Sequence, residues 1–168
     1  MPSTLTQVAI LIAFASLVGW AAISDFSRFI IPNRICLAIV ALYPAHVLAG
    51  GAIDWQGAAL LAAATFAAGS VLFALRIVGG GDVKFLAAVT LWVGPAQFWP
   101  FMIVMALAGG VLALAYIVAT RAWRPLAVRA IGMASGIEQH VLPETLRVPY
   151  GIAIAVGGLC AVAQLAMP

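Results

Sequence analysis

Two aspartates stand out among the few ionisable residues of this sequence. The chain has only five carboxylates: Asp25, Asp54, Asp82, Glu138 and Glu144. Asp25 and Asp82 each adjoin a long apolar run, whereas the other three lie in more polar connections. An ionisable group beside hydrocarbon is costly to keep, so it is a candidate for function. These two aspartates are therefore the first candidates for chemistry.

A pair of carboxylates has a specific use in catalysis. When two of them lie within a few ångströms, they do not both ionise easily, and they tend to share one proton. One then serves as the base that activates water, and the other as the acid that protonates the carbonyl or the leaving group. This is the apparatus of an aspartic protease. The sequence offers no HExxH, no nucleophile elbow and no phosphate loop for a competing mechanism.

Each aspartate, taken singly, also has a simple structural interpretation. Asp82 follows Gly79-Gly80-Gly81 and precedes an apolar helix, so it fits a helix N-cap, which is worth about 1 kcal/mol. Asp25 lies close to Arg28 and fits an ion pair at a helix end. Both interpretations stay open for the single residues.

The elements that must position these residues are membrane helices. Of the 168 residues, 65% are hydrophobic and only 8% are charged, whereas a soluble domain is about half apolar and about a quarter charged. The apolar residues come in long runs, which argues against a soluble fold and makes the lipid bilayer a partner. Cys36 and Cys160 are isolated, without the spacing that suits zinc, so no metal or other cofactor is expected.

The apolar runs predict an all-α, polytopic membrane helix bundle that forms a single domain over residues 1–168. Because a span takes roughly 20 apolar residues, we expect about six transmembrane helices. They are expected near residues 5–24, 31–49, 57–75, 82–93, 97–120 and 148–167. Gly94-Pro95 should interrupt the chain between the fourth and the fifth. The polar segment 121–147 fits either a cover over the site or a basic loop on anionic lipid.

The basic residues predict the orientation of this bundle. With six spans, all eight Lys and Arg residues fall on one side of the membrane. They are Arg28, Arg34, Arg76, Lys84, Arg121, Arg124, Arg129 and Arg147. Because Lys and Arg concentrate in cytoplasmic loops, Asp25 and Asp82 should lie at the cytoplasmic face and both termini on the other side. The net charge of +3 then needs no nucleic-acid partner.

The motifs around the two aspartates resemble those of one protease family. Gly79-Gly80-Gly81-Asp82 matches the GxGD motif of the prepilin peptidases, in which the aspartate is catalytic. Asp25, followed by Ile31-Pro32-Asn33, resembles the other catalytic aspartate of that family and its Ile-Pro-Asn segment. Val148-Pro149-Tyr150-Gly151 resembles the segment that opens the last helix of the family. The three segments occur in the family's order and span nearly the whole chain.

The resemblance implies an aspartic peptidase that removes short basic leaders from type IV prepilins or pseudopilins at the cytoplasmic face of the bacterial inner membrane. It implies that Asp25 and Asp82 are catalytic, and that the glycines before Asp82 let the substrate backbone approach. Lys84 fits either a role in orienting Asp82 or binding of anionic lipid. Asn33 fits either a hydrogen-bonding role near the site or a role in starting its helix.

The resemblance also narrows the type of peptidase. Many members carry an additional cytoplasmic domain with cysteine pairs, associated with N-methylation of the mature pilin. The chain shows no CxxC and no such domain, so we expect no methyltransferase activity. The short form resembles the peptidases of tight-adherence (Flp-type) pili.

Two other functions fit parts of the pattern. Presenilin-type proteases share GxGD, but they combine it with Tyr-Asp and Pro-Ala-Leu motifs, and this chain has Ser24-Asp25-Phe26 and no Pro-Ala-Leu. A small transporter or a non-catalytic scaffold would also use intramembrane aspartates. Transport sites usually lie near the membrane midplane, whereas Asp25 and Asp82 are expected at one face. A cleavage assay with a defined precursor separates these functions.

Overall fold

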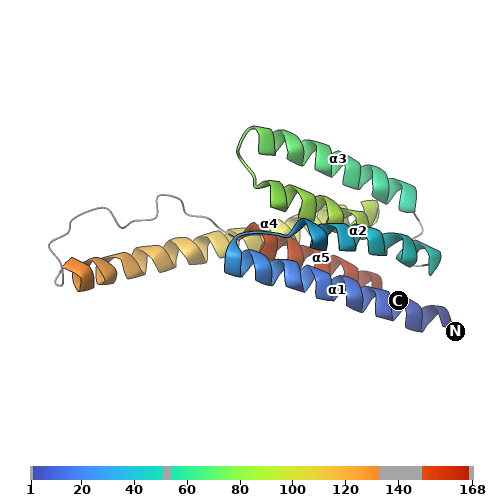
Figure 1. The fold of residues 1–168 in the computed structure, drawn as a ribbon, viewed down its shortest axis with the longest axis horizontal. Helices are drawn as coiled ribbons and strands as arrows, with labels where there is room; N and C mark the ends of the chain where they lie inside the picture. The colour runs from blue at the N-terminus through green and yellow to red at the C-terminus, as the bar shows by residue number, and fades with distance from the viewer. Residues whose placement is uncertain (1, 51–53, 133–148, 167–168) are drawn as a thin grey trace.

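The fold is an all-α bundle, as the sequence predicts. The computed structural model describes residues 2–50, 54–132 and 149–166, which contain five helices and no strand (Figure 1). The helices are α1 (Pro2–Arg28), α2 (Asn33–Leu48), α3 (Trp55–Ala74), α4 (Gly80–Gly132) and α5 (Tyr150–Ala166). Within the described part of the chain, three stretches are long and apolar enough to cross a membrane: Leu5–Arg28, Trp55–Ala74 and Gly80–Ala119. Because α2 and α5 are shorter apolar helices, six complete spans stay a prediction.

The longest helix, α4, contains the interruption that Gly94-Pro95 predicts. Gly94 has φ 66° and ψ 175°, so α4 consists of two helical segments joined at this residue. Glycine adopts this conformation at little cost, and proline is favoured at the start of a helical segment. The two segments run side by side in opposite directions (Figure 1), which brings Leu86 and Met105 to the lining of one cavity.

Two helix ends differ from the expected boundaries. α1 continues through the polar residues after Ser24 and ends at Arg28, where Phe29 takes a left-handed φ of 52°. Asp25 therefore lies in the last turn of α1 and not beyond it. The second segment of α4 continues to Gly132, so the expected connection from residue 121 is helical in its first part. Residues 133–148, which include Glu138, His140, Glu144 and Arg147, lie outside the described residues.

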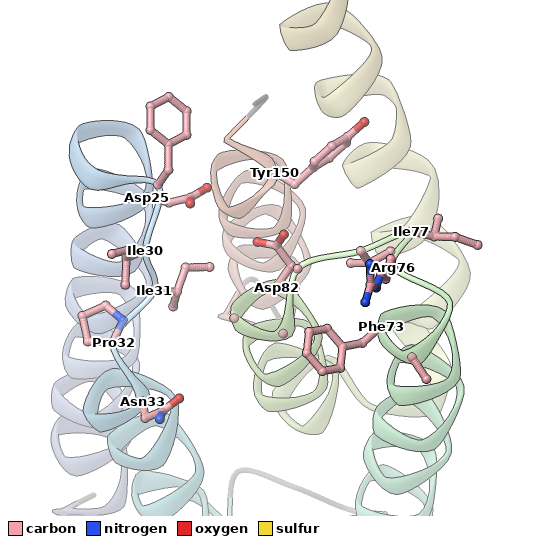
Figure 2. Close-up of a pocket in the computed structure, with 16 residues that line it drawn as sticks. Asp25, Ile30, Ile31, Pro32, Asn33, Phe73, Arg76, Ile77, Asp82 and Tyr150 are labelled. Carbon is pink, nitrogen blue, oxygen red and sulfur yellow. The ribbon is translucent and has the colours of Figure 1, made fainter. Parts of the chain in front are cut away.

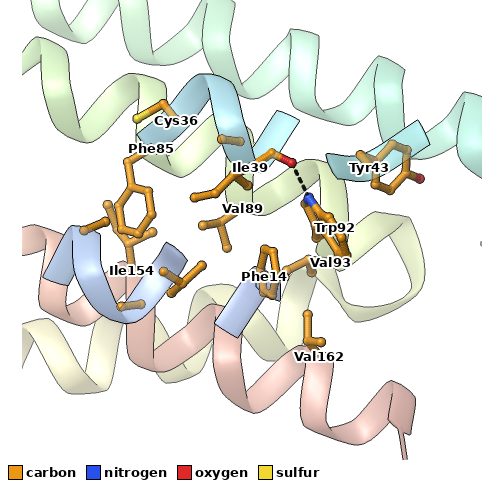
Figure 3. Packing of buried hydrophobic residues seen from close by; sticks show 14 of the residues in the cluster. Phe14, Cys36, Ile39, Tyr43, Phe85, Val89, Trp92, Val93, Ile154 and Val162 are labelled. Carbon is orange, nitrogen blue, oxygen red and sulfur yellow. Dashed lines mark hydrogen bonds between the residues drawn. The ribbon is translucent and has the colours of Figure 1, made fainter. Parts of the chain in front are cut away.

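The core forms where α1, α2, α4 and α5 meet (Figure 3). Trp92 of α4 stacks on Phe14 of α1, with ring centroids 4.4 Å apart. Its indole Nε1–H donates a hydrogen bond to the backbone oxygen of Ile39 in α2 at 2.9 Å. A buried indole needs such an acceptor, and the bond connects α2 to α4.

The outer surface is also apolar, as a lipid-facing surface must be. Large side chains such as Trp20, Ile23, Leu60 and Leu107 are more than 60% exposed. A soluble monomer rarely exposes apolar side chains over such an extent. In a bilayer the same side chains face hydrocarbon, while the helices satisfy their own backbone hydrogen bonds.

Glycines set the close contact between α4 and α5. A Cβ atom at Gly158 would lie 2.5 Å from Val89 Cγ1, and Val89 is fully buried. Because a valine in a helix has essentially one rotamer, we expect Gly158→Ala to lower the free energy of unfolding by about 1–3 kcal/mol through overpacking. Thermal unfolding in detergent, followed by circular dichroism, measures this loss.

A matched variant controls for the change from glycine to alanine itself. A Cβ atom at Gly19 of α1 would meet nothing within 4 Å. Gly19→Ala should therefore leave stability unchanged or raise it by up to about 1 kcal/mol, because alanine is the better helix former. Equal midpoints for the two variants would show that α4 and α5 are not packed this closely.

Candidate active site

The end of α1 fixes the position of Asp25. This aspartate is buried, with 5% of its surface exposed. Immediately after it the chain turns, and the Phe29 N–H donates a hydrogen bond to the Asp25 backbone oxygen at 2.8 Å. The Ser24 hydroxyl donates a second hydrogen bond to the Ile30 oxygen, also at 2.8 Å. These two bonds fix the turn and with it the direction of the Asp25 side chain.

The start of α5 holds the Asp25 carboxylate. The Gly151 N–H donates a hydrogen bond to Asp25 Oδ2 at 2.7 Å. Gly151 is the second residue of α5, so its N–H has no partner within the helix, and the helix dipole favours an acidic group there. Among the described residues no ion pair joins Asp25 to Arg28, so the ion-pair interpretation of Asp25 is wrong.

Asp82 lies at the start of α4, at the end of the connection from α3. α4 begins at Gly80, so Asp82 belongs to its first turn and is not the N-cap residue. An acidic side chain in the first turn is favoured by the helix dipole. A Cβ atom at Gly79 would lie 2.9 Å from Asp82 Oδ2. The glycine therefore leaves room for the carboxylate beside the connection.

The two aspartates line one cavity of about 1110 Å³. Figure 2 shows both carboxylates facing the same space, Asp25 from the end of α1 and Asp82 from the start of α4. Gly79–Gly81 and Asn33, which the sequence singled out, line the same cavity. Within the described ranges, no group of three or more His, Cys, Asp or Glu side chains suits a metal ion. The chemistry that these residues support is that of two carboxylates acting on water.

Two described connections line this cavity at one end of the bundle: residues 29–32 between α1 and α2, and residues 75–79 between α3 and α4. The ends of α1 and α3 and the starts of α2, α4 and α5 all lie there (Figure 1). Arg76, in the connection between α3 and α4, lines the cavity and has a left-handed φ of 59°. No pattern in the sequence predicts that Arg76 and Phe73 line the cavity, because both occur in ordinary connecting or apolar segments.

Gly151 is the site residue whose role sequence reasoning missed. The sequence predicts only that the segment Pro149-Tyr150-Gly151 opens the last helix. Its physical signal was a glycine in the first turn of a helix, where a free N–H is available to an acceptor. That Asp25 is the acceptor depends on how α5 packs against α1.

Lys84 lies outside the lining of this cavity. Its Nζ donates a hydrogen bond to Asn33 Oδ1 at 3.1 Å, which connects α4 to the start of α2. It also lines a separate, mostly apolar cavity of about 520 Å³ between α2, α3 and α4. The polar contact of Lys84 is thus with Asn33 and not with Asp82.

We expect Lys84→Gln to have a small effect. Its hydrogen bond is exposed, and exposed polar contacts contribute little, about 1 kcal/mol or less. If the two carboxylates hydrolyse a peptide, kcat/KM of the purified protein for that peptide should fall by less than about fivefold. A loss of about a hundredfold would show that Lys84 acts directly on the reacting groups.

Comparison with known proteins identifies a family for this chain. Residues 12–118 match the type IV leader peptidase family. The matched range exceeds half of the chain and contains both Asp25 and Asp82. No curated protein and no solved structure matches the chain. From its sequence match, the chain belongs to the type IV leader peptidase family.

Proposed function

We propose that this chain is a membrane aspartic endopeptidase that removes the short basic leader of type IV, Flp-like prepilins or pseudopilins. The observation that carries the proposal is the cavity that Asp25 and Asp82 share. The family match supports proteolysis of a leader peptide. The resemblance of the short form to the peptidases of Flp-type pili supports the narrower substrate.

The proposed reaction is direct hydrolysis by water held between the two carboxylates. One carboxylate accepts a proton from the water, and the other donates a proton to the peptide carbonyl oxygen. The tetrahedral intermediate then collapses as the carboxyl group that took a proton from water gives it to the leaving nitrogen, and a hydroxyl of the intermediate returns a proton to the other carboxylate. Gly151 keeps Asp25 in place during these steps through its N–H, and the glycines before Asp82 leave space for the substrate backbone.

The proposed orientation places this site at the cytoplasmic face of the inner membrane. Arg28 and Arg34 flank the turn between α1 and α2, and Arg76 and Lys84 flank the start of α4; all four are exposed. The end of α4 extends beyond the same end of the bundle (Figure 1). Because Lys and Arg favour the cytoplasmic side, their distribution supports this orientation.

Co-expression with an Flp-type prepilin tests the proposed function. Leader removal is read by gel shift, and the new N-terminus is read by mass spectrometry. We expect a single cut at the end of the basic leader, in cells that contain the chain and not in cells that lack it. If the chain is present in membranes and none of a panel of prepilins is cut, the substrate assignment is wrong.

A further inference from the structure

A second, apolar cavity adjoins the candidate active site. It has a volume of about 540 Å³ and lies between α3, the two segments of α4, and α5. Apolar side chains such as Leu72, Leu86, Met105 and Ile154 line it. Asp82 belongs to the lining of this cavity and of the first one. The two cavities therefore meet at a candidate catalytic residue.

The second cavity extends from Asp82 into the apolar part of the bundle. Along the second segment of α4 its lining reaches from Ala113 to Met105, which corresponds to about 12 Å at the rise of a helix. Both residues belong to the stretch Gly80–Ala119 that is apolar enough to span a membrane. A peptide at this depth must be apolar and helical, because water is not available to its backbone.

Gly110 leaves open space in the wall of this cavity. A Cβ atom at Gly110 would meet no atom of the described residues within 4 Å, whereas one at Gly109 would lie 3.6 Å from the Cβ of Ala153 in α5. Gly110 is exposed and lines the cavity. Gly110 therefore adds no side chain to the lining, and a Cβ atom at this position would lie in open space.

A peptide substrate is the occupant that fits both cavities. Its scissile bond must lie at the carboxylates, so the chain on one side of that bond has to leave past Asp82. The first cavity, with Asp25 and Asn33 in its lining, suits a polar segment. The second cavity suits an apolar one, and it begins where the bond would be cut.

We propose, on the basis of the proposed peptidase function, that the second cavity binds the apolar helical segment that directly follows the scissile bond. Binding there fixes which bond reaches the aspartates. Gly110 is then a specificity-determining residue, because any larger side chain at this position would occupy the space of the substrate helix.

Gly110→Leu tests this proposal with purified protein and two synthetic substrates. One substrate has the leader and the complete apolar segment, and the other ends a few residues after the scissile bond. For the wild type, we expect kcat/KM to be at least about tenfold higher for the long substrate. Gly110→Leu should lower the value for the long substrate at least about tenfold, mainly through KM, and leave the short substrate within about twofold.

Gly19→Leu is the matched control, because a Cβ atom at Gly19 also has no neighbour within 4 Å and Gly19 lines neither cavity. The kcat/KM of Gly19→Leu should equal that of the wild type for both substrates.

The proposal is overturned if Gly110→Leu lowers kcat/KM equally for both substrates, or if it lowers neither. The same holds if the effect of Gly110→Leu disappears when phospholipid is removed, since an acyl chain would then be the occupant. If the wild type cuts neither substrate, the proposed peptidase function itself fails, and this inference fails with it.

Discussion

Asp25→Asn and Asp82→Asn should each lower kcat/KM for leader cleavage by at least about 10³-fold. An amide has nearly the shape of the carboxylate but neither accepts nor donates the proton that the reaction moves. The helix ends should therefore form as in the wild type while hydrolysis stops. Mass spectrometry of the released leader, normalised to the amount of folded protein, measures the rate.

Asp54→Asn is the control for these two substitutions. Asp54 caps α3 by accepting a hydrogen bond from the Gly57 N–H at 2.8 Å, and asparagine caps helices equally well. It lies at the opposite end of α3 from the cavity, about 30 Å away along a helix of 20 residues. The rate of leader cleavage by Asp54→Asn should stay within about twofold of the wild-type rate. If Asp25→Asn or Asp82→Asn kept a tenth of the wild-type rate, the proton-transfer role of that residue would be refuted.

Gly151→Ala should lower kcat by about 10- to 100-fold and change KM little. A Cβ atom at this position would lie 2.7 Å from Asp25 Oδ2 and 3.0 Å from Asp25 Cβ. The aspartate must therefore move, and displacement of a catalytic group by about 1 Å costs about 10²-fold in rate. Steady-state kinetics with a leader peptide separate the effects on kcat and KM.

Loss of helical structure is not the expected cause of this defect. Alanine favours a helix more than glycine does, by about 1 kcal/mol, so α5 should form at least as well. Gly19→Ala provides the control, since no atom lies within 4 Å of its Cβ position. A Gly151→Ala protein with wild-type kcat would show that the contact between α5 and Asp25 does not position the carboxylate.

The features of the fold that the sequence predicted are those that depend on local pattern. Apolar runs predicted the helices, and Gly94-Pro95 predicted the break in α4, because glycine and proline act on the backbone directly. Helix ends were less predictable. Ser24 and Asp25 are polar but compatible with a helix, so α1 continues until the left-handed turn at Phe29. Boundaries of this kind depend on packing against neighbouring helices.

The charge distribution predicted one feature of the candidate site, namely that its two aspartates lie at the same end of the bundle. Asp25 and Asp82 were expected at one face because the basic residues around them fall on the same side, and the structure brings both into one cavity. The partner of the Asp25 carboxylate was not predictable, since Gly151 is 126 residues away in the chain. The same is true of the bond from Lys84 to Asn33, which spans 51 residues.

The most direct test of the central claim is whether Asp25 and Asp82 act as one unit. The measurement is kcat/KM for one prepilin peptide with purified wild type, Asp25→Asn, Asp82→Asn and the double variant. Residues that share one catalytic step lose activity non-additively, so the double variant should be as slow as either single variant, about 10³-fold below the wild type. Losses that multiply to about 10⁶-fold, or a single variant that cleaves at the wild-type rate, would contradict a shared two-aspartate site.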